Sequence, residues 1–358
     1  MSKQTKILFL INDITMPGGL SRVTKNLVND FAQFGNEFHV RALSAAAKYG
    51  KYHHSRVDYL EMPALHGLNA ASKLVWYGSL RREVEYYVDS QEVDIVIAVG
   101  TAMNLFASFC KFKRASLWGA EHTAHNYFGP FRKLMKRWRY PKLQRLICLT
   151  YADKVHHYDK YLNRVVVIPN YTNFSEVESV YSNRHRFLFI GRYNKTKGVD
   201  YLADIIEKVH FACPSWLFDL YGEGEDKQWL QNRLTELNLD HIVEVNDPTN
   251  DVCHEYQKAG VFILTSRNEG FPMVLLEAQA HGLPIVSFDC ETGPSEIITD
   301  GEDGYLVPAF DVETFAKRLI KLANDEVKRL DMSARAVKNR QRFGKDAILS
   351  LWLDQFRT

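Results

Sequence analysis

Two carboxylates eight residues apart are the side chains of this chain best placed to do chemistry. Glu269 lies in a polar loop after the apolar run 261–265, and Glu277 lies in a helical segment that begins near Pro272 and ends at Gly282. If both were helical, a rise of about 1.5 Å per residue would part them by roughly 12 Å. The facing carboxylates of a glycosidase lie about 5 to 9.5 Å apart, so an acid/base pair is not expected. Two acceptors with free helix N–H groups between them suit a ligand with hydroxyls at both ends and phosphate in the middle.

A second group of candidate residues is cationic. Arg192 and Lys197 lie between the apolar run 187–190 and a helical segment. An Arg fork, a Lys point charge and the N–H groups of a helix start together form an anion site. A basic surface loop is the alternative interpretation. The position after the carboxyl end of a strand favours the ligand site, because doubly wound sheets bind ligands there.

Glycine-rich turns follow two further strands. Gly18 and Gly19 open a helical segment that contains Arg22, and Tyr221 and Gly222 follow a later apolar run. Glycine lets the backbone approach a ligand closely. Paired glycines are also common in ordinary turns, so these turns are weaker signals alone.

The elements that must position these residues are short apolar runs that alternate with helical-period segments. Near-continuous apolar strands predict sheets that are covered on both faces, and the two series predict two doubly wound α/β domains. The runs are 7–11, 39–43, 94–99, 115–118, 146–149 and 165–168, then 187–190, 217–221, 242–245, 261–265, 285–288 and 305–307.

Length and composition agree with two domains. The chain has 358 residues, and about 150 residues per domain is the usual size. The polar stretch 175–186 predicts an interdomain connection, so we expect domains 1–171 and 172–340. The segment 341–358 ends in an apolar helical stripe that needs a surface to cover it.

Charge and cysteine content exclude several functional classes. Lys+Arg 45 against Asp+Glu 43 leaves a net charge of +2, which argues against nucleic acid as a partner. The five cysteines are scattered and never spaced as C-x-x-C, so neither a disulfide framework nor a zinc site is expected. The apolar run 7–11 is too short for a secretory signal or a membrane span. A cytoplasmic protein is the expectation.

The Glu-Gly-Phe-Pro motif at 269–272 and the Glu-x7-Glu spacing resemble motifs of family 4 of the retaining glycosyltransferases. These enzymes have the GT-B fold, in which two Rossmann-like domains face each other across a cleft. The resemblance covers essentially the whole chain and is strongest from Gly191 to Val307. It implies that Glu269 contacts the hydroxyls of the donor sugar and that Glu277 contacts the nucleotide ribose. It also implies that the helix at 341–358 packs back on the first domain. Two solvated glutamates on a surface helix are the alternative for the spacing alone.

The resemblance extends to residues around these glutamates. It implies that Arg192 and Lys197 bind the donor diphosphate, and that His122 contacts the donor sugar near the reacting carbon. Glu121 and Asn170 are candidates for the acceptor side. The remaining residues expected to line the nucleotide-sugar site are Gly18, Gly19, Arg22, Gly191, Tyr221, Gly222, Gly270, Phe271 and Pro272.

The resemblance also implies a reaction without a protein nucleophile or a metal. The chain has no G-x-S-x-G motif and no catalytic cysteine signature. Front-face attack is then implied, in which the leaving phosphate oxygen accepts the proton of the acceptor hydroxyl. No Asp-x-Asp motif accompanies the sites, so we expect no metal and no cofactor. Cationic side chains would stabilise the leaving diphosphate.

A basic and aromatic stretch at 131–145 contains seven Lys or Arg and no acid. Such a stretch suits an anionic bilayer surface, and a solvated helix face is the alternative. The membrane candidates are Arg132, Lys133, Lys136, Arg137 and Trp138.

The function predicted from the sequence is transfer of a hexose or N-acetylhexosamine, from a donor expected to be UDP-linked, to a lipid-linked or polysaccharide acceptor. The setting would be lipopolysaccharide, capsule or exopolysaccharide synthesis at the inner face of the cytoplasmic membrane. An NAD-dependent oxidoreductase is a second hypothesis, disfavoured because the first strand is not followed by G-x-G-x-x-G. A non-catalytic sugar- or lipid-binding module is a third.

Overall fold

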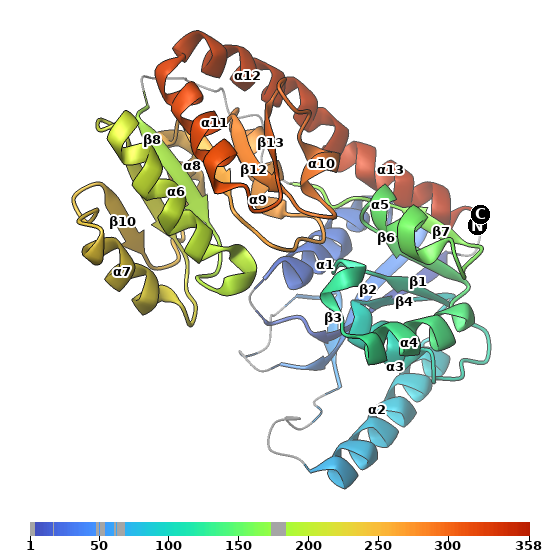
Figure 1. Cartoon of the computed structure of the whole chain (residues 1–358). Coiled ribbons are helices and arrows are strands. Elements are labelled where there is room, and N and C mark those ends of the chain that lie inside the picture. The colour runs from blue at the N-terminus through green and yellow to red at the C-terminus, as the bar shows by residue number, and fades with distance from the viewer. Residues whose placement is uncertain are drawn as a thin grey trace. The chain divides into compact units, whose positions relative to one another are not determined.

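The computed structural model describes residues 4–16, 18–47, 50, 54–60, 62, 69–172 and 184–358. The chain divides into two compact units, Met1–Pro169 and Asn170–Thr358. In Figure 1 the first unit runs from blue to green and the second from yellow-green to red.

The first unit is built on a parallel sheet of strand order β3-β2-β1-β4-β5-β6-β7. The order reverses between β1 and β4, which pair directly, so the switch point of this sheet lies there. Its strands are β1 (Thr5–Asp13), β2 (Phe38–Ala46), β3 (Val57–Tyr59), β4 (Ile95–Val99), β5 (Ser116–Ala120), β6 (Arg145–Cys148) and β7 (Val165–Val167). Its helices are α1 (Gly19–Asp30), α2 (Ala70–Ser90), α3 (Thr101–Ala107), α4 (Pro130–Arg139) and the short α5 (Tyr151–Asp153).

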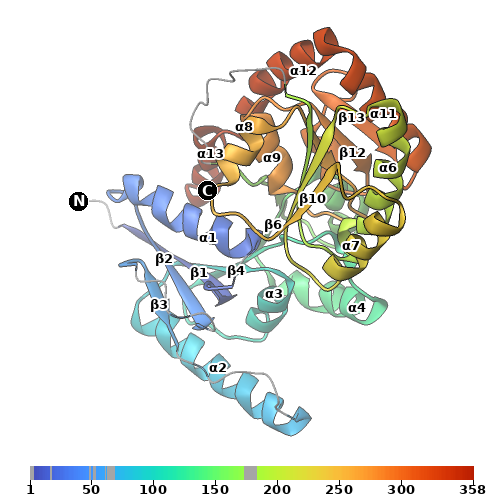
Figure 2. The same ribbon diagram turned by 90° about the vertical axis from the view of Figure 1, so that its left-hand side faces the viewer.

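Helices cover both faces of this sheet, with α1 on one face and α2 on the other (Figure 2). Helix α2 begins at an Asn69 cap, whose side chain accepts a hydrogen bond from the Ser72 N–H at 2.8 Å. Its buried residues recur every four positions and form one stripe that packs in the same cluster as the β1 side chains. That stripe consists of Trp76, Leu80, Val84 and Val88.

The second unit has a parallel sheet of order β10-β9-β8-β11-β12-β13, with the switch point between β8 and β11. Its strands are β8 (Arg186–Ile190), β9 (Leu217–Tyr221), β10 (Val243–Asn246), β11 (Val261–Leu264), β12 (Ile285–Asp289) and β13 (Gly304–Pro308). Its helices are α6 (Val199–Ala212), α7 (Lys227–Glu236), α8 (Val252–Lys258), α9 (Met273–Ala280), α10 (Pro294–Ile297), α11 (Val312–Asn324), α12 (Glu326–Asn339) and α13 (Lys345–Phe356).

Both predicted doubly wound α/β folds are confirmed, and each apolar run overlaps a strand. The strand β3 was not predicted, because its three residues Val57–Tyr59 are too short to show a pattern. Helix α9 begins at Met273, so Pro272 takes the cap position and not the first helical position.

The terminal helix α13 forms where the apolar stripe predicts it, and Ile348, Trp352 and Phe356 are buried. Its packing on the first domain stays a prediction. In the described ranges, none of the helices is both long enough and apolar enough to span a bilayer.

Candidate functional site

The loop after β8 holds Lys197 in a fixed backbone turn. The Asn194 side chain accepts a hydrogen bond from the Lys197 N–H at 3.0 Å, and Gly198 then takes the left-handed conformation with φ 66°. A Cβ atom at Gly198 would lie 2.0 Å from the Thr265 carbonyl oxygen, so only glycine fits there. The Thr265 hydroxyl also donates to the Lys197 carbonyl at 2.8 Å. The loop after β8 is therefore held against the end of β11.

The Lys197 ammonium lies 2.6 Å from Oε1 of Glu269. The same carboxylate oxygen accepts from the Ser266 hydroxyl at 2.5 Å, and the Thr292 hydroxyl donates to the Glu269 backbone carbonyl at 2.5 Å. The Glu269 side chain is 9% exposed and the Lys197 side chain 25% exposed. The structure thus fixes a carboxylate and a cation side by side at the switch point of the second sheet.

Arg267 ties the two loops together a second time. Its guanidinium makes two parallel hydrogen bonds to the Asp200 carboxylate at 2.7 and 2.6 Å, and its backbone N–H donates to the Thr196 carbonyl at 2.8 Å. The fork geometry gives this pair more directional strength than a Lys pair would have. It lowers the pKa of Asp200 through the hydrogen bond from Arg267. A rigid frame therefore surrounds Lys197 and Glu269.

Glu277 lies on α9 and is buried. The Tyr256 hydroxyl donates to its Oε2 at 2.8 Å, and the Tyr256 ring stacks on His281 with centroids 4.9 Å apart. Burial is the main cause that lowers the pKa of His281, which favours its neutral form. The predicted arrangement, with Glu269 in a loop and Glu277 on the following helix, is present.

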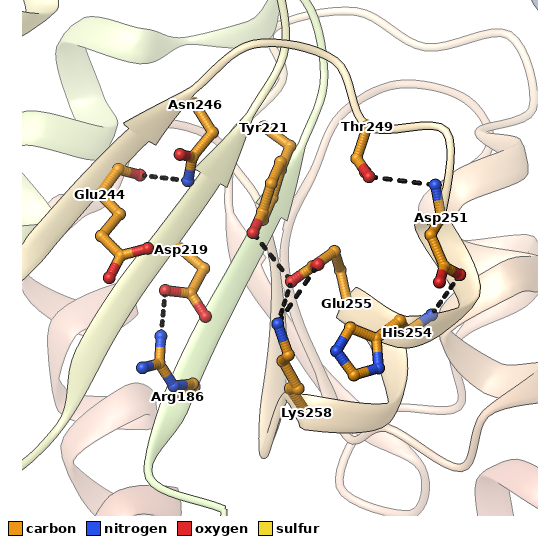
Figure 3. A network of polar contacts seen from close by, with 10 residues as sticks. All are labelled: Arg186, Asp219, Tyr221, Glu244, Asn246, Thr249, Asp251, His254, Glu255 and Lys258. Carbon is orange, nitrogen blue, oxygen red and sulfur yellow. Dashed lines mark hydrogen bonds and ion pairs between the residues drawn. The ribbon is translucent and has the colours of Figure 1, made fainter.

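Tyr221 is the first residue of the predicted nucleotide turn, and its hydroxyl is engaged inside the unit. It donates to Oε2 of Glu255 on α8 at 2.8 Å, and Lys258 lies 3.4 Å from Oε1 of the same carboxylate (Figure 3). Arg186 and Asp219 form a neighbouring pair at 2.5 Å. The Tyr221 hydroxyl therefore fastens β9 to α8.

That turn requires a glycine. A Cβ atom on Gly222 would lie 1.9 Å from the Gly191 carbonyl oxygen, so the two strand-end turns touch through backbone atoms. Arg192 follows Gly191 and is exposed. Gly270 is half-buried, whereas Phe271 and Pro272 are buried at the start of α9. Gly191, Arg192, Gly222 and Glu269 thus lie in the loops that follow β8, β9 and β11, whereas Glu277 lies further along the chain, on α9.

In the first unit, Gly18 and Gly19 lie at the start of α1, after the switch-point strand β1. Gly18 has a φ of 134°, and a Cβ atom there would meet no neighbour within 4 Å. The glycine therefore serves the backbone conformation and leaves open space above it. Arg22 is exposed on the first turn of α1.

Glu121 and Lys136 form a buried ion pair in the first unit, with Nζ 3.3 Å from Oε2 and exposed fractions of 0% and 2% for Lys136 and Glu121. The Glu121 carboxylate also accepts from Thr101 and Asn104, each at 2.7 Å, and from the Tyr140 hydroxyl. This arrangement corrects two predictions. Lys136 cannot contact a membrane, because it points into the core, and the Glu121 carboxylate is already saturated with donors, so it does not face an acceptor.

Two other predicted residues differ in exposure. His122 is half-buried beside Glu121, and desolvation lowers its pKa to about 4, although the Glu121 charge acts in the opposite direction. It is therefore neutral near pH 7. Asn170 is buried in the second unit, with 7% of its surface exposed, which gives it little surface to offer an acceptor.

Helix α4 presents an exposed apolar face. Phe131, Leu134 and Trp138 follow the spacing i, i+3 and i+7 and are 73%, 64% and 60% exposed. Arg132 and Arg137 are exposed on the same helix, and Lys133 is half-buried. Of these three apolar residues only Trp138 was predicted to contact a membrane, because that prediction rested mainly on charge.

Thr292 and Tyr256 are site residues that the sequence analysis missed. The Thr292 hydroxyl donates to Glu269, which lies 23 positions away, and the Tyr256 hydroxyl donates to Glu277, which lies 21 positions away. Such a pairing has no local sequence signal, so it could be found only from the fold.

Residues 170–341 match the family model described as glycosyl transferases group 1. The amylovoran biosynthesis glycosyltransferase AmsD of Erwinia amylovora is 27% identical over 359 residues, which cover 98% of this chain and 99% of that protein. An alpha-1,4-N-acetyl-D-galactosaminyltransferase of Campylobacter jejuni, whose name gives a PP-undecaprenol substrate, is 26% identical and covers 97% of both chains.

Among solved structures, S. aureus TarM in complex with fondaparinux, alpha-GlcNAc-glycerol and UDP has a similar fold. Its TM-score is 0.84, with 16% identity over 99% of this chain and 100% of that one. At this identity the similarity concerns the fold.

Proposed function

This chain belongs to the group 1 glycosyltransferases, and on that premise we propose that it is a retaining enzyme that moves a hexose or N-acetylhexosamine from a UDP-sugar to a lipid-linked or polysaccharide acceptor. The observation that carries the proposal is the 2.6 Å contact between Lys197 and Glu269. In a nucleotide sugar the diphosphate is attached to the anomeric carbon of the sugar. A cation for the phosphate and a carboxylate for the sugar hydroxyls must therefore stand next to each other, as these two do.

Each residue of the site then has a role that its surroundings support. Lys197 and the exposed Arg192 bind the diphosphate, and Glu269 binds hydroxyls of the sugar. Ser266 and Thr292 hold Glu269 in place. The neutral His122 side chain would contact the sugar near the reacting carbon.

The reaction needs no protein nucleophile. The acceptor hydroxyl oxygen forms a bond to the anomeric carbon while the bond from that carbon to the diphosphate oxygen breaks, and the hydroxyl proton passes to the leaving phosphate oxygen. Attack and departure on one face retain the configuration. The cations stabilise the negative charge that develops on the leaving group, where preorganised donors have their largest effect.

Three similar proteins support the choice of substrates. The TarM chain was solved with UDP, which favours uracil as the base. AmsD is named for amylovoran biosynthesis, and the Campylobacter jejuni enzyme is named with a PP-undecaprenol substrate. A surface-glycan acceptor carried on a lipid would be reached at a membrane. The exposed Phe131, Leu134 and Trp138 of α4, with Arg132 beside them, suit that surface.

A thermal-shift panel tests the proposal. UDP, GDP, ADP, NADH, UDP-glucose and UDP-N-acetylglucosamine would each be added to the whole chain, because a ligand that binds only the native state raises its stability by about 2.7 kcal/mol at 100 times its dissociation constant. UDP and one UDP-sugar should raise the Tm more than the other nucleotides. A response to NADH alone would contradict the proposal and favour an oxidoreductase.

A further inference from the structure

The first unit has a hollow of about 330 Å³ between α4 and the segment that follows α5. We call it the basic hollow. The site described above leaves its lining unused. The hollow is lined by His125, Lys133, Leu134, Arg137, His156, His157, Lys160 and Tyr161.

The charge of the basic hollow is of one sign. Six of its eight lining residues are Lys, Arg or His, and none is acidic. Lys133 and Arg137 are four residues apart and so share one face of α4, and Lys160 comes from the other side. Across the described ranges, no carboxylate forms an ion pair with any of these three cations. Lys133 donates to the neutral Asn126 amide oxygen, which leaves its charge uncompensated. Such a concentration of positive charge attracts anions.

Two polar atoms in the lining lack hydrogen-bond partners. Nδ1 of His125 and the hydroxyl oxygen of Tyr161 are buried, and neither has a partner within the described part of the chain. His125 as a whole is 9% exposed. Buried polar groups in native proteins are nearly always paired, so an orphaned pair in one hollow points to a missing ligand. Both groups can donate a hydrogen bond, the imidazole through the suitable tautomer.

The cations of the hollow also affect the pKa of His125, one of the histidines that line it. The rings of His125 and His157 stack with centroids 4.3 Å apart. The pKa of His125 is lowered to about 3, first by burial and then by the charges of Lys136, His157, Lys133 and Lys160. The Asp153 carboxylate accepts a hydrogen bond from the His125 backbone N–H at 3.1 Å. An anion in the hollow would offset the repulsion from these cations, and the His125 pKa would then rise.

We propose that the basic hollow binds a phosphate or diphosphate group. That the group belongs to the acceptor rests on the proposed function. Phosphate oxygens can accept from the Arg137 fork, from the two ammonium groups and from the orphaned donors together. A neutral glycan would leave the three cations without a counter-charge. The hollow is distinct from the site of Lys197 and Glu269, because all its lining residues belong to the first unit.

The test is titration calorimetry of the whole chain with inorganic pyrophosphate in the presence of saturating UDP, which keeps pyrophosphate out of the nucleotide site. The variant K133Q/R137Q/K160Q removes the cations of the hollow. The matched control K111Q/K142Q/R164Q removes three exposed cations elsewhere in the same unit. We expect pyrophosphate affinity to fall at least about tenfold in the hollow variant, because three charged hydrogen-bond donors are removed, and to stay within about twofold in the control.

A second readout does not need a variant. The His125 imidazole signal, followed by NMR as pH is varied, should titrate at a higher pH once pyrophosphate is bound. A wild-type chain that does not bind pyrophosphate beside UDP, equal weakening in both variants, or an unmoved His125 titration would each overturn the inference. UDP binding and sugar transfer are measured separately. If the chain neither bound UDP nor transferred sugar, the proposed function would be refuted, but the assignment of the hollow as a phosphate site would stand.

Vesicles distinguish the source of the group. If the hollow variant loses pyrophosphate but still floats with phosphatidylglycerol vesicles as the wild type does, the group is a phosphate of the acceptor that lies clear of the bilayer. If it loses both, and free pyrophosphate also releases the wild-type chain from the vesicles, the hollow takes the phosphate of a lipid headgroup. Either result supports the site.

Discussion

The Lys197 ammonium and the Glu269 carboxylate touch at 2.6 Å although 72 residues separate them in the sequence. They meet because β8 and β11 are neighbours in the sheet and each strand is followed by one of the two loops. The Thr265 hydroxyl and the Arg267 fork then fix both loops to each other. The contact between a cation and a carboxylate is thus a product of the strand order, at the point where doubly wound sheets bind ligands.

The diphosphate contacts give the first prediction. Lys197→Ala and Arg192→Ala should each weaken UDP binding by about 1.5 to 3 kcal/mol, because each removes a hydrogen bond from a charged donor to phosphate. Titration calorimetry with UDP measures the loss. Lys195→Ala is the matched control, since Lys195 lies in the same turn and is exposed. Sugar transfer should also persist in EDTA, and strict dependence on added magnesium or manganese would count against this assignment.

The ribose end of the site gives the second prediction. Glu277→Gln should weaken nucleotide affinity more than it lowers kcat, because its contact is made equally in the ground and transition states. Tyr256→Phe removes one hydroxyl that donates to Glu277 and should cost about 0.5 to 1.5 kcal/mol of affinity. Phe keeps the aromatic ring that stacks on His281, so the variant removes only the hydroxyl. Unaltered UDP affinity in both variants would refute the role of Glu277.

The separate motifs proposed for the donor site can be recognised in the sequence because each of them is local, whereas the contact between Lys197 and Glu269 depends on the strand order. Glu269 and Glu277 share one loop and helix, and the glycine at 198 is required by a left-handed turn. The sequence does not show in which direction a side chain points. Lys136 stands among exposed cations on α4, yet it points inward, because its helix position faces Glu121 rather than solvent. Glu121 likewise follows a strand end, where a ligand group is expected, but it is saturated by donors from α3, from α4 and from Tyr140 just after α4 that no spacing in the sequence reveals.

The buried pair in the first unit gives the third prediction. Lys136→Met should destabilise the chain by about 3 to 5 kcal/mol, because it leaves the Glu121 charge buried without a counter-charge. Adding Glu121→Gln should recover much of the loss, since the amide needs no cation. Urea unfolding measures both, and Arg132→Met serves as the control because Arg132 is exposed. A loss in Lys136→Met no larger than in the control would contradict the buried placement of Lys136.

The exposed face of α4 gives the fourth prediction. The wild-type chain should float with vesicles rich in phosphatidylglycerol, and less so as salt rises, because exposed charges are screened over about 8 Å at physiological ionic strength. Phe131→Ser with Trp138→Ser should release the protein while leaving UDP affinity intact. Tyr86→Ser with Phe211→Ser is the matched control, since both side chains are exposed elsewhere. If the α4 variant floats like the wild type, this face is merely solvated.

The most direct measurement is the steady-state kinetics of Glu269→Gln with the UDP-sugar that the thermal-shift panel selects. The carboxylate would strengthen its contacts to the sugar hydroxyls as the sugar is transferred, so kcat should fall about 10- to 100-fold, in line with the loss of a charged hydrogen bond. UDP affinity and the Tm should stay close to the wild-type values. An unchanged kcat in a correctly folded Glu269→Gln variant would contradict the claim that Glu269 and Lys197 together form the donor site.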